Sequence, residues 1–130
     1  MDIDHLNRMP FAELTGFAWT RAENGEAAIV MDVRQAHSNS SGKLHGGMLA
    51  ALADSVGTTA IATAVGRSVV TADLRVSYLR PVEPGQRITA SAKMTHIAGS
   101  TGFASITLAD DSGEVLCLGQ ITCIIRKPSS

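Results

Sequence analysis

Apolar and polar residues alternate with a period of two over much of the chain. The alternation covers residues 68–79 and 86–97. Two further segments, residues 103–110 and 114–127, follow the turn signals GSTG and DDSG and complete a set of four. In residues 68–79, one set of positions is Val70, Ala72, Leu74, Val76 and Tyr78, and the other is Thr71, Asp73, Arg75 and Ser77. Because successive side chains of a strand point to opposite faces of a sheet, all four segments are predicted to be strands. Two more strands are predicted at residues 14–21 and 26–33. They flank Asn24-Gly25, a pair that suits the positive φ angles of a type I′ hairpin turn.

One segment has the character of a helix instead. Residues 46–65 are predicted to form one long helix that ends at Gly66, in the position of a C-cap glycine. At 100° per residue, the side expected to press on the sheet is Leu49, Leu52, Val56, Thr59 and Thr63. The opposite side consists of Ala50, Ala51, Asp54, Gly57, Thr58 and Ile61. Because small residues allow close approach, this second side is expected to meet another subunit or a substrate.

The order of these elements predicts the fold class. A short, possibly helical lead at residues 2–8 is followed by two strands, the long helix and four strands. We therefore expect an α+β fold, in which an antiparallel sheet of five or six strands is wrapped around one long helix. The length of 130 residues suits a single domain over residues 1–130.

Composition narrows the classes of partner. A net charge of −1 and an aromatic content of 4% provide neither the basic footprint nor the stacking platforms of a nucleic-acid-binding protein. An aspartate near the middle of residues 46–65 would cost about 2.5–3.5 kcal/mol in a bilayer. That segment is therefore expected to be a buried soluble helix, and no membrane partner is expected.

The cysteines and the first residues predict the compartment. Cys117 and Cys123 would lie about 20 Å apart along one strand, too far for a disulfide between them. The first residues lack the basic stretch and apolar run of a signal peptide. A cytoplasmic protein with reduced thiols is therefore expected.

Asp54 is the first candidate for chemistry. Between Lys43 and Arg67 it is the one side chain that is fully charged at neutral pH. Aspartate has a poor propensity for a helix interior, and this one lies too far from the helix start to be an N-cap. A carboxylate in apolar surroundings is a candidate general base, and the alternative is a structural aspartate bonded to a serine, a threonine or a neighbouring helix.

The second candidate is His45-Gly46-Gly47, at the start of the same helix. Two glycines there leave backbone N–H groups with no side chain to block them, at the positive end of the helix dipole. Such a place can hold a carbonyl oxygen or an oxyanion, and the alternative is a flexible connection into the helix. His45 could be a base, a metal ligand or a capping hydrogen-bond donor, and a role in capping or positioning this segment is favoured. No Cys or Glu is near enough to suggest a zinc site, so no metal is expected.

The spacing of the two candidates predicts a shared site. From Gly46 to Asp54 is about 12 Å along a helix, at 1.5 Å per residue. A base and an oxyanion donor that serve one carbonyl must both lie within about 3–4 Å of it. If both groups are catalytic, Gly46-Gly47 of one chain must meet Asp54 of another, as two-fold pairing would allow.

Several other polar residues remain open to two interpretations. Asn39 is either a turn former or an amide that orients a carbonyl or a water. Thr58 lies one turn after Asp54 and could hold a water, and Thr71 is another candidate hydroxyl, although an ordinary structural role is favoured for each threonine. The GSTG sequence at residues 99–102 could bind phosphate through backbone N–H groups, but an ordinary hairpin turn is favoured.

The stretch from Asn39 to Asp54 resembles a known motif. Asn39, Gly42, His45-Gly46-Gly47, Leu52 and Asp54 match N-x-x-G-x-x-H-G-G-x-x-x-x-L-x-D of the PaaI-like hotdog-fold thioesterases, relatives of 4-hydroxybenzoyl-CoA thioesterase. The resemblance extends over nearly the whole chain. It implies a hotdog fold, a homodimer with one continuous sheet and two shared active sites, and usually a dimer of dimers. It also implies hydrolysis of an acyl-CoA, aromatic (as in phenylacetate degradation) or medium-chain, with coenzyme A as part of the substrate and no cofactor.

The resemblance also implies roles in the core of the site. Gly46, with Gly47, would supply the backbone N–H that polarises the thioester carbonyl. Asp54 would activate water or attack directly. Asn39 matches a polar positioning residue, and His45 would orient this region.

Further positions match the family less directly. Thr58 matches a hydroxyl used in the 4-hydroxybenzoyl-CoA branch, and Thr71 matches a serine or threonine of the PaaI-like relatives. Gly99, Ser100 and Thr101 fall where relatives contact coenzyme A. Two rival functions remain: a hotdog hydratase or dehydratase of acyl thioesters, and a non-catalytic module that binds acyl-CoA or an aromatic ligand.

Overall fold

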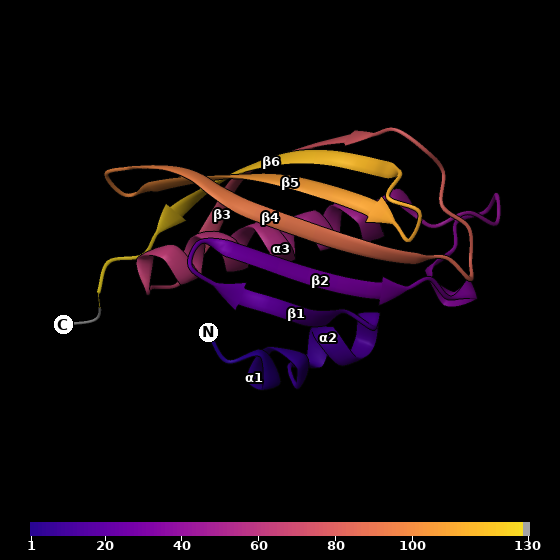
Figure 1. The fold of residues 1–130 in the computed structure, drawn as a ribbon, viewed down its shortest axis with the longest axis horizontal. Helices are drawn as coiled ribbons and strands as arrows, with labels where there is room; N and C mark the ends of the chain where they lie inside the picture. The colour runs from indigo at the N-terminus through magenta and orange to yellow at the C-terminus, as the bar shows by residue number, and fades with distance from the viewer. Residues whose placement is uncertain (129–130) are drawn as a thin grey trace.

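Six antiparallel strands and one long helix account for most of the chain in the computed structural model, which describes residues 1–128 (Figure 1). The elements are α1 (Ile3–Asn7), α2 (Pro10–Thr15), β1 (Ala18–Glu23), β2 (Glu26–Asp32), the 3₁₀ turn η1 (Gln35–His37), α3 (Gly46–Val65), β3 (Val69–Tyr78), β4 (Arg87–Ala98), β5 (Thr101–Asp110) and β6 (Val115–Ile125). The strands lie in the order β1-β2-β4-β5-β6-β3. The predicted α+β arrangement is confirmed, with six strands. The end of the predicted domain range, residues 129–130, lies outside the described residues.

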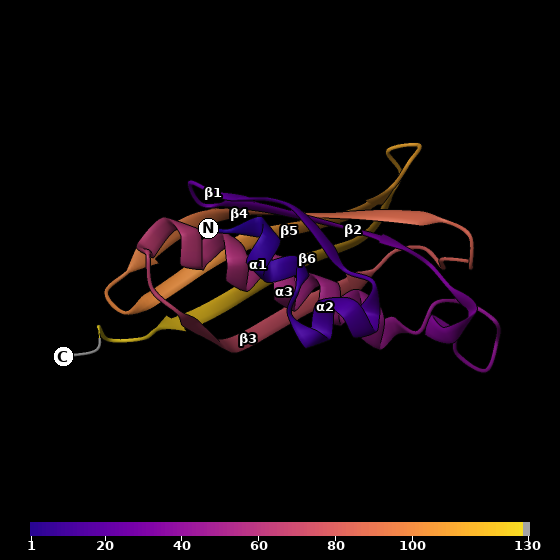
Figure 2. The same cartoon turned by 90° about the horizontal axis from the view of Figure 1, so that it is seen from below.

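Helix α3 has the predicted bounds because both of its ends are capped. His45 is the N-cap, and Gly66 ends the helix in the left-handed region at φ 66°, with its N–H bonded to the carbonyl of Ala62. Figure 2 shows the helix lying along one face of the sheet. Among the described helices it is the one long and apolar enough to cross a bilayer, and it is the core helix that the sheet wraps.

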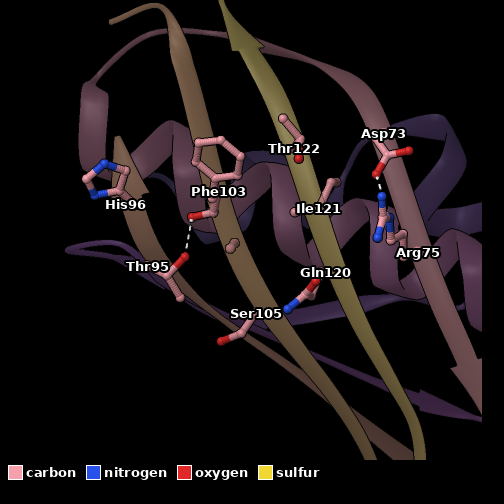
Figure 3. Close-up of a pocket in the computed structure, with 10 residues that line it drawn as sticks. Asp73, Arg75, Thr95, His96, Phe103, Ser105, Gln120, Ile121 and Thr122 are labelled. Carbon is pink, nitrogen blue, oxygen red and sulfur yellow. Dashed lines mark hydrogen bonds and ion pairs between the residues drawn. The ribbon is translucent and has the colours of Figure 1, made fainter. Parts of the chain in front are cut away.

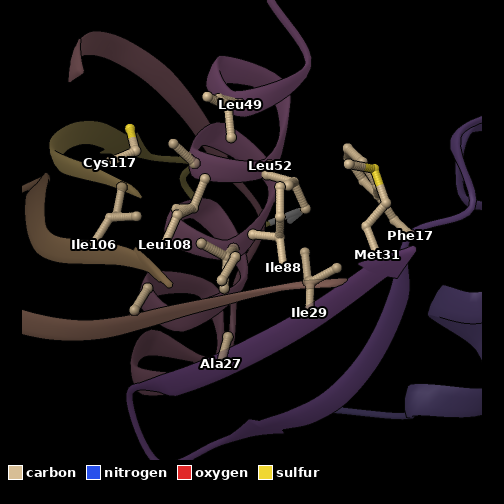
Figure 4. Packing of buried hydrophobic residues seen from close by; sticks show 14 of the residues in the cluster. Phe17, Ala27, Ile29, Met31, Leu49, Leu52, Ile88, Ile106, Leu108 and Cys117 are labelled. Carbon is tan, nitrogen blue, oxygen red and sulfur yellow. The ribbon is translucent and has the colours of Figure 1, made fainter. Parts of the chain in front are cut away.

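The core lies between α3 and the inner face of the sheet (Figure 4). Leu49 and Leu52 of the helix meet strand residues such as Ile29, Ile88 and Leu108, all of them buried. The side of α3 predicted to press on the sheet therefore does so.

The prediction for the opposite, small-residue side of α3 is wrong in part. Gly57 and Ile61 are buried against the sheet. A Cβ on Gly57 would lie 2.7 Å from Ile121 Cγ2, and Ile61 contacts the backbone at Gly102. The sheet curls far enough to cover more than one side of the helix, which a single-helix projection does not show.

This close approach gives a stability prediction. Gly57→Val should lower the free energy of unfolding by about 1–3 kcal/mol, because the added groups overlap Ile121 and Ile106. Ala64→Val, at an exposed position of the same helix, is the control and should change stability little. Denaturant unfolding measures both, and equal stability of the two variants would contradict the packing described.

The N-terminal part shows one confirmed feature and one error. Asn24 and Gly25 have φ angles of 52° and 78°, so the predicted turn is present between β1 and β2. The first strand, however, begins at Ala18 rather than residue 14, because α2 precedes it. The signals of that helix are in the sequence: Pro10 at its first position and Gly16 at its left-handed C-cap.

Strand β3 ends the sheet on one side. It pairs with β6 alone, so its other edge has no partner within the described chain. It also leaves apolar side chains exposed, including Val70 and Tyr78. A long edge strand with apolar side chains is a natural place for another chain to pair.

Candidate active site

His45 organises the start of α3. Its Nδ1 accepts the N–H of Gly47 at 2.8 Å, and its own N–H donates to the carbonyl of His37 at 2.8 Å. A Cβ on Gly47 would lie 2.8 Å from that same Nδ1. Glycine at this position therefore lets the imidazole close over the first turn. The predicted capping role of His45 is confirmed, although its ring accepts the capping hydrogen bond rather than donating it.

The two glycines are not equivalent. The prediction that both N–H groups are unpaired is wrong for Gly47, because His45 already accepts its proton. The Gly46 carbonyl accepts the hydroxyl of Tyr78 at 3.0 Å. Within residues 1–128, no hydrogen bond occupies the Gly46 N–H. Gly46 is thus the donor left for a carbonyl oxygen at the positive end of a 20-residue helix.

Asp54 has a specific partner on the neighbouring strand. Thr71 Oγ1 donates a hydrogen bond of 2.5 Å to Asp54 Oδ1. This hydrogen bond fixes one oxygen of the carboxylate. The side chain is half-buried, so the carboxylate keeps access to solvent. This hydrogen bond is consistent both with a catalytic Asp54 that Thr71 holds in place and with a purely structural aspartate. The residues around the pair must therefore distinguish the two roles.

A β-bulge brings Thr71 to the helix. Thr71 pairs with Cys123, but the next pair is Asp73 with Thr122, so Ala72 is an extra residue in β3. The predicted alternation of this strand is therefore wrong in its first half: Val70 is 44% exposed, and Thr71 faces Asp54. An inserted residue shifts the following side chains to the other face, which periodicity alone cannot anticipate.

Cys123 of β6 lies opposite Thr71 in the sheet, next to the Asp54–Thr71 pair. Burial and, to a smaller extent, the nearby Asp54 carboxylate raise the pKa of its thiol to about 11, although the hydrogen bond with Thr71 acts in the opposite direction. Burial also raises the pKa of Cys117. Both cysteines are free, as predicted.

These shifts predict unreactive thiols. The thiolate is the reactive form of cysteine. With a pKa of about 11, only about one Cys123 thiol in a thousand would be ionised at pH 8. Ellman's reagent should therefore label neither cysteine in the native protein, and label both after unfolding in guanidinium. Rapid labelling of the native protein at pH 8 would contradict the burial described.

Thr58 and Asn39 are engaged in local structure. Thr58 Oγ1 donates to the backbone carbonyl of Asp54 at 2.9 Å, not to its carboxylate. Asn39 Oδ1 accepts the N–H groups of Ser41 at 2.9 Å and Lys43 at 3.1 Å, which folds the loop before α3. Both residues thus have the structural role that the sequence left open, and any catalytic role for them stays a prediction.

Gly99, Ser100 and Thr101 lie away from the start of α3 in the same chain. They form the turn between β4 and β5, with Gly99 at φ 60° and the Ser100 carbonyl accepting the N–H of Ile125. The adjoining Gly102 packs on Ile61, in the C-terminal half of α3. Their predicted contact with coenzyme A therefore stays a prediction.

Two surface hollows differ in their relation to these residues. One, of about 470 Å³, adjoins Gly46 and is bounded by Asn39, Lys43, Leu49 and Tyr78, among others. The other, of about 430 Å³, lies on the outer face of the sheet around His96 and Phe103 (Figure 3). It contains none of the predicted site residues. Among the described residues no group of His, Cys, Asp and Glu is arranged to hold a metal ion.

The Asp54–Thr71 hydrogen bond can be tested directly. Thr71→Val should lower kcat about ten- to hundredfold, because a hydrogen bond to a charged group contributes about 1.5–3 kcal/mol. Thr71→Ser restores the hydroxyl and should recover most of the rate. Thiol release from an acyl-CoA, the substrate that the family resemblance implies, measures both. Equal rates for the valine and serine variants would show that the Thr71 hydroxyl does not contribute to catalysis.

Comparison with known proteins decides the family. The family model described as "Thioesterase superfamily" matches residues 41–117, more than half of the chain. Acyl-coenzyme A thioesterase 13 of Mus musculus is 33% identical over 94 residues, which are 71% of this chain and 67% of that protein. The chain belongs to the thioesterase superfamily. It is a thioester hydrolase of the acyl-CoA thioesterase class, and the family resemblance read from Asn39 to Asp54 is confirmed.

Two solved structures share the fold. The PaaI protein of the E. coli phenylacetic acid degradation operon matches with a TM-score of 0.90 at 23% identity, over 97% of this chain and 91% of that chain. A mutant of the phenylacetic acid degradation protein PaaI from Thermus thermophilus matches with a TM-score of 0.85 at 30% identity, over 91% and 100% of the two chains. The hotdog fold is therefore shown.

Sequence reasoning missed two residues that contact this region. Tyr78 bonds the Gly46 carbonyl from β3, and His37 bonds the His45 N–H from the preceding loop. An aromatic residue on the exposed end of an edge strand was the available signal for Tyr78. His37 lies in a polar loop, where the sequence gives no sign that it is buried.

Proposed function

We propose that this thioesterase hydrolyses acyl-CoA with water, at a site that forms between two copies of the chain. The observation that carries the proposal is the separation of the two groups that the chemistry needs. The Gly46 N–H opens the first turn of α3, and Asp54 lies eight residues later on the same continuous helix, about 12 Å away. One carbonyl cannot contact both groups of one chain.

The edge strand supports this arrangement. A second copy that pairs along β3 in antiparallel fashion would extend the sheet across a two-fold axis. Thr71 and Tyr78 are both on β3, and they bond Asp54 and Gly46 respectively. The two groups therefore flank the same edge, so pairing there would bring Gly46 of one copy towards Asp54 of the other. Two such sites would form in each homodimer.

The chemistry then follows from the two groups. The substrate carbonyl oxygen accepts the Gly46 N–H, and Asp54 takes a proton from water as its oxygen attacks the carbonyl carbon. The tetrahedral oxyanion collapses, the carbon–sulfur bond breaks, and the coenzyme A thiolate takes the proton back from Asp54. Direct attack by Asp54 would give a mixed anhydride that water then hydrolyses. Thr71 fixes the carboxylate in either case, and no cofactor takes part.

We propose that the hollow beside Gly46 binds the substrate. Its walls include the apolar side chains of Leu49, Leu79 and Val82, and Lys43 and Arg80 also line it. Apolar walls suit an acyl group, and cationic side chains suit the phosphates of coenzyme A. We retain a cytoplasmic location and a dimer of dimers as parts of this proposal.

A panel of acyl-CoA substrates tests the function and identifies the acyl group. Phenylacetyl-CoA and straight-chain thioesters from hexanoyl- to dodecanoyl-CoA are each incubated with the protein, and release of free thiol is followed. The proposal predicts turnover of at least one. Hydration of an enoyl-CoA without thiol release would indicate a hydratase instead, and saturable binding without any turnover would indicate a ligand-binding module.

A further inference from the structure

His37 connects the N-terminal part of the chain to the start of α3. It ends the 3₁₀ turn η1, eight residues before the N-cap residue His45, and is only 6% exposed. A buried imidazole in a polar loop needs partners for both of its ring nitrogens.

Both ring nitrogens have partners in the backbone. His37 Nδ1 accepts the N–H of Arg34 at 3.0 Å, and Nε2 lies 2.9 Å from the carbonyl oxygen of Thr15, at the end of α2. The neutral ring with its proton on Nε2 satisfies both contacts, so this hydrogen-bond network assigns the tautomer. The Arg34 guanidinium lies beside the ring, with Nη2 3.1 Å from Nε2; in this tautomer both nitrogens carry hydrogen, so the contact is not a hydrogen bond, and Nη2 donates to the carbonyl of Leu14 instead. The imidazole is therefore a fixed cross-link between α2 and the loop.

The backbone of His37 continues the link to the site. Its carbonyl accepts the His45 N–H at 2.8 Å, and a bridge between Ser38 and Leu44 closes the same loop. His45 in turn accepts the Gly47 N–H. One chain of hydrogen bonds thus runs from Thr15 through His37 and His45 to the first turn of α3.

We propose that His37 is a positioning residue for thioester hydrolysis, which holds His45 and thereby sets the direction of the Gly46 N–H. Its imidazole fixes the loop against α2, and its carbonyl fixes the peptide of the N-cap. A donor that stabilises an oxyanion must be held within a fraction of an ångström, so a small shift of this loop reduces the rate without removing any group that contacts substrate. The role rests on the proposed function of Gly46.

Kinetics of two variants test the role. His37→Phe keeps an aromatic ring, somewhat larger than the imidazole, and removes both hydrogen bonds of the ring nitrogens. His37→Gln keeps a donor within reach of the Thr15 carbonyl. We expect kcat to fall about tenfold or more for the phenylalanine variant, with a much smaller change in KM, and to recover in part for the glutamine variant. If His37→Phe does not fold, His37→Gln alone should still show a lowered kcat.

Asn7→Ala is the matched control. The Asn7 side chain also ties an N-terminal helix to the body of the protein, through hydrogen bonds with the N–H and carbonyl of Trp19 at 2.7 and 3.1 Å. It has no link to His45. Activity is measured at a temperature at which all variants are folded. Asn7→Ala should then keep the wild-type kcat, even if its Tm falls as far as that of the His37 variants. An equal loss of kcat in this control, or a kcat within twofold of wild type for both His37 variants, would overturn the proposal.

Amide hydrogen exchange separates this inference from the proposed function. In the His37 variants the amides of His45 and Gly47 should exchange at least about tenfold faster than in the wild type, and in Asn7→Ala they should not. Unchanged exchange would refute the link through His45. Exchange requires no substrate, so it decides the link even if the wild type releases no thiol from any acyl-CoA, a result that would refute the proposed function instead.

Discussion

Replacing Asp54 by asparagine is expected to lower kcat by about 10²–10⁴-fold, the usual contribution of general acid–base catalysis. The amide keeps the size of the side chain, and its oxygen can still accept the Thr71 hydroxyl, so the fold should be retained. What is lost is the ability to take a proton from water or to attack the carbonyl. Thiol release from the best acyl-CoA of the panel measures the loss.

The control for this prediction is Asp32→Asn. Asp32 is an exposed carboxylate at the end of β2 that pairs with Arg87 and, within residues 1–128, makes no hydrogen bond to Asp54, Thr71 or Gly46. Removal of an exposed ion pair changes stability little, and activity should not change. If the Asp54 variant keeps more than a tenth of the wild-type kcat, Asp54 is a structural residue and the mechanism is wrong.

Replacing Gly46 by proline is expected to lower kcat by about 10²–10³-fold, because it removes a single N–H donor from the proposed oxyanion site. Proline is well tolerated at the first position of a helix. The preceding His45 has φ −63° and ψ 130°, which is the extended conformation that a following proline favours. The substitution should therefore delete the donor and little else.

Gly46→Ala is the matched variant. Its Cβ would lie 3.5 Å from the Tyr78 ring, an ordinary contact, and it keeps the N–H. We expect kcat within a few-fold of wild type for alanine and a large loss for proline. Similar rates for the two variants would show that the Gly46 N–H does not contact the developing charge.

Most of the fold could be predicted because local signals and the global pattern agree. The Asn24-Gly25 turn, the C-cap at Gly66 and the alternation in β4 each follow from the backbone and side-chain preferences of a few neighbouring residues. Helix α2 was missed although Pro10 and Gly16 mark its ends, because six residues carry too little periodicity to identify a helix.

The site was less accessible to sequence reasoning, for a physical reason. Asp54 and Gly46 stand out by residue type and position, but their partners come from strands and loops whose register is set by tertiary pairing. The bulge at Ala72 turns Thr71 towards Asp54, and the N-cap contact of His45 leaves Gly46 rather than Gly47 as the available donor. Neither follows from the order of residues along the chain.

A defined heterodimer tests the shared site most directly. Asp54→Asn and Gly46→Pro chains are co-expressed with different affinity tags, and the mixed dimer is isolated by two successive affinity steps under conditions in which any dimer of dimers is dissociated. If Gly46 of one copy serves Asp54 of the other, this dimer contains one intact site and one doubly defective site. It should show about half of the wild-type activity per dimer, although each variant alone is nearly inactive. A mixed dimer no more active than its two parents, or a monomer with full activity, would contradict the account.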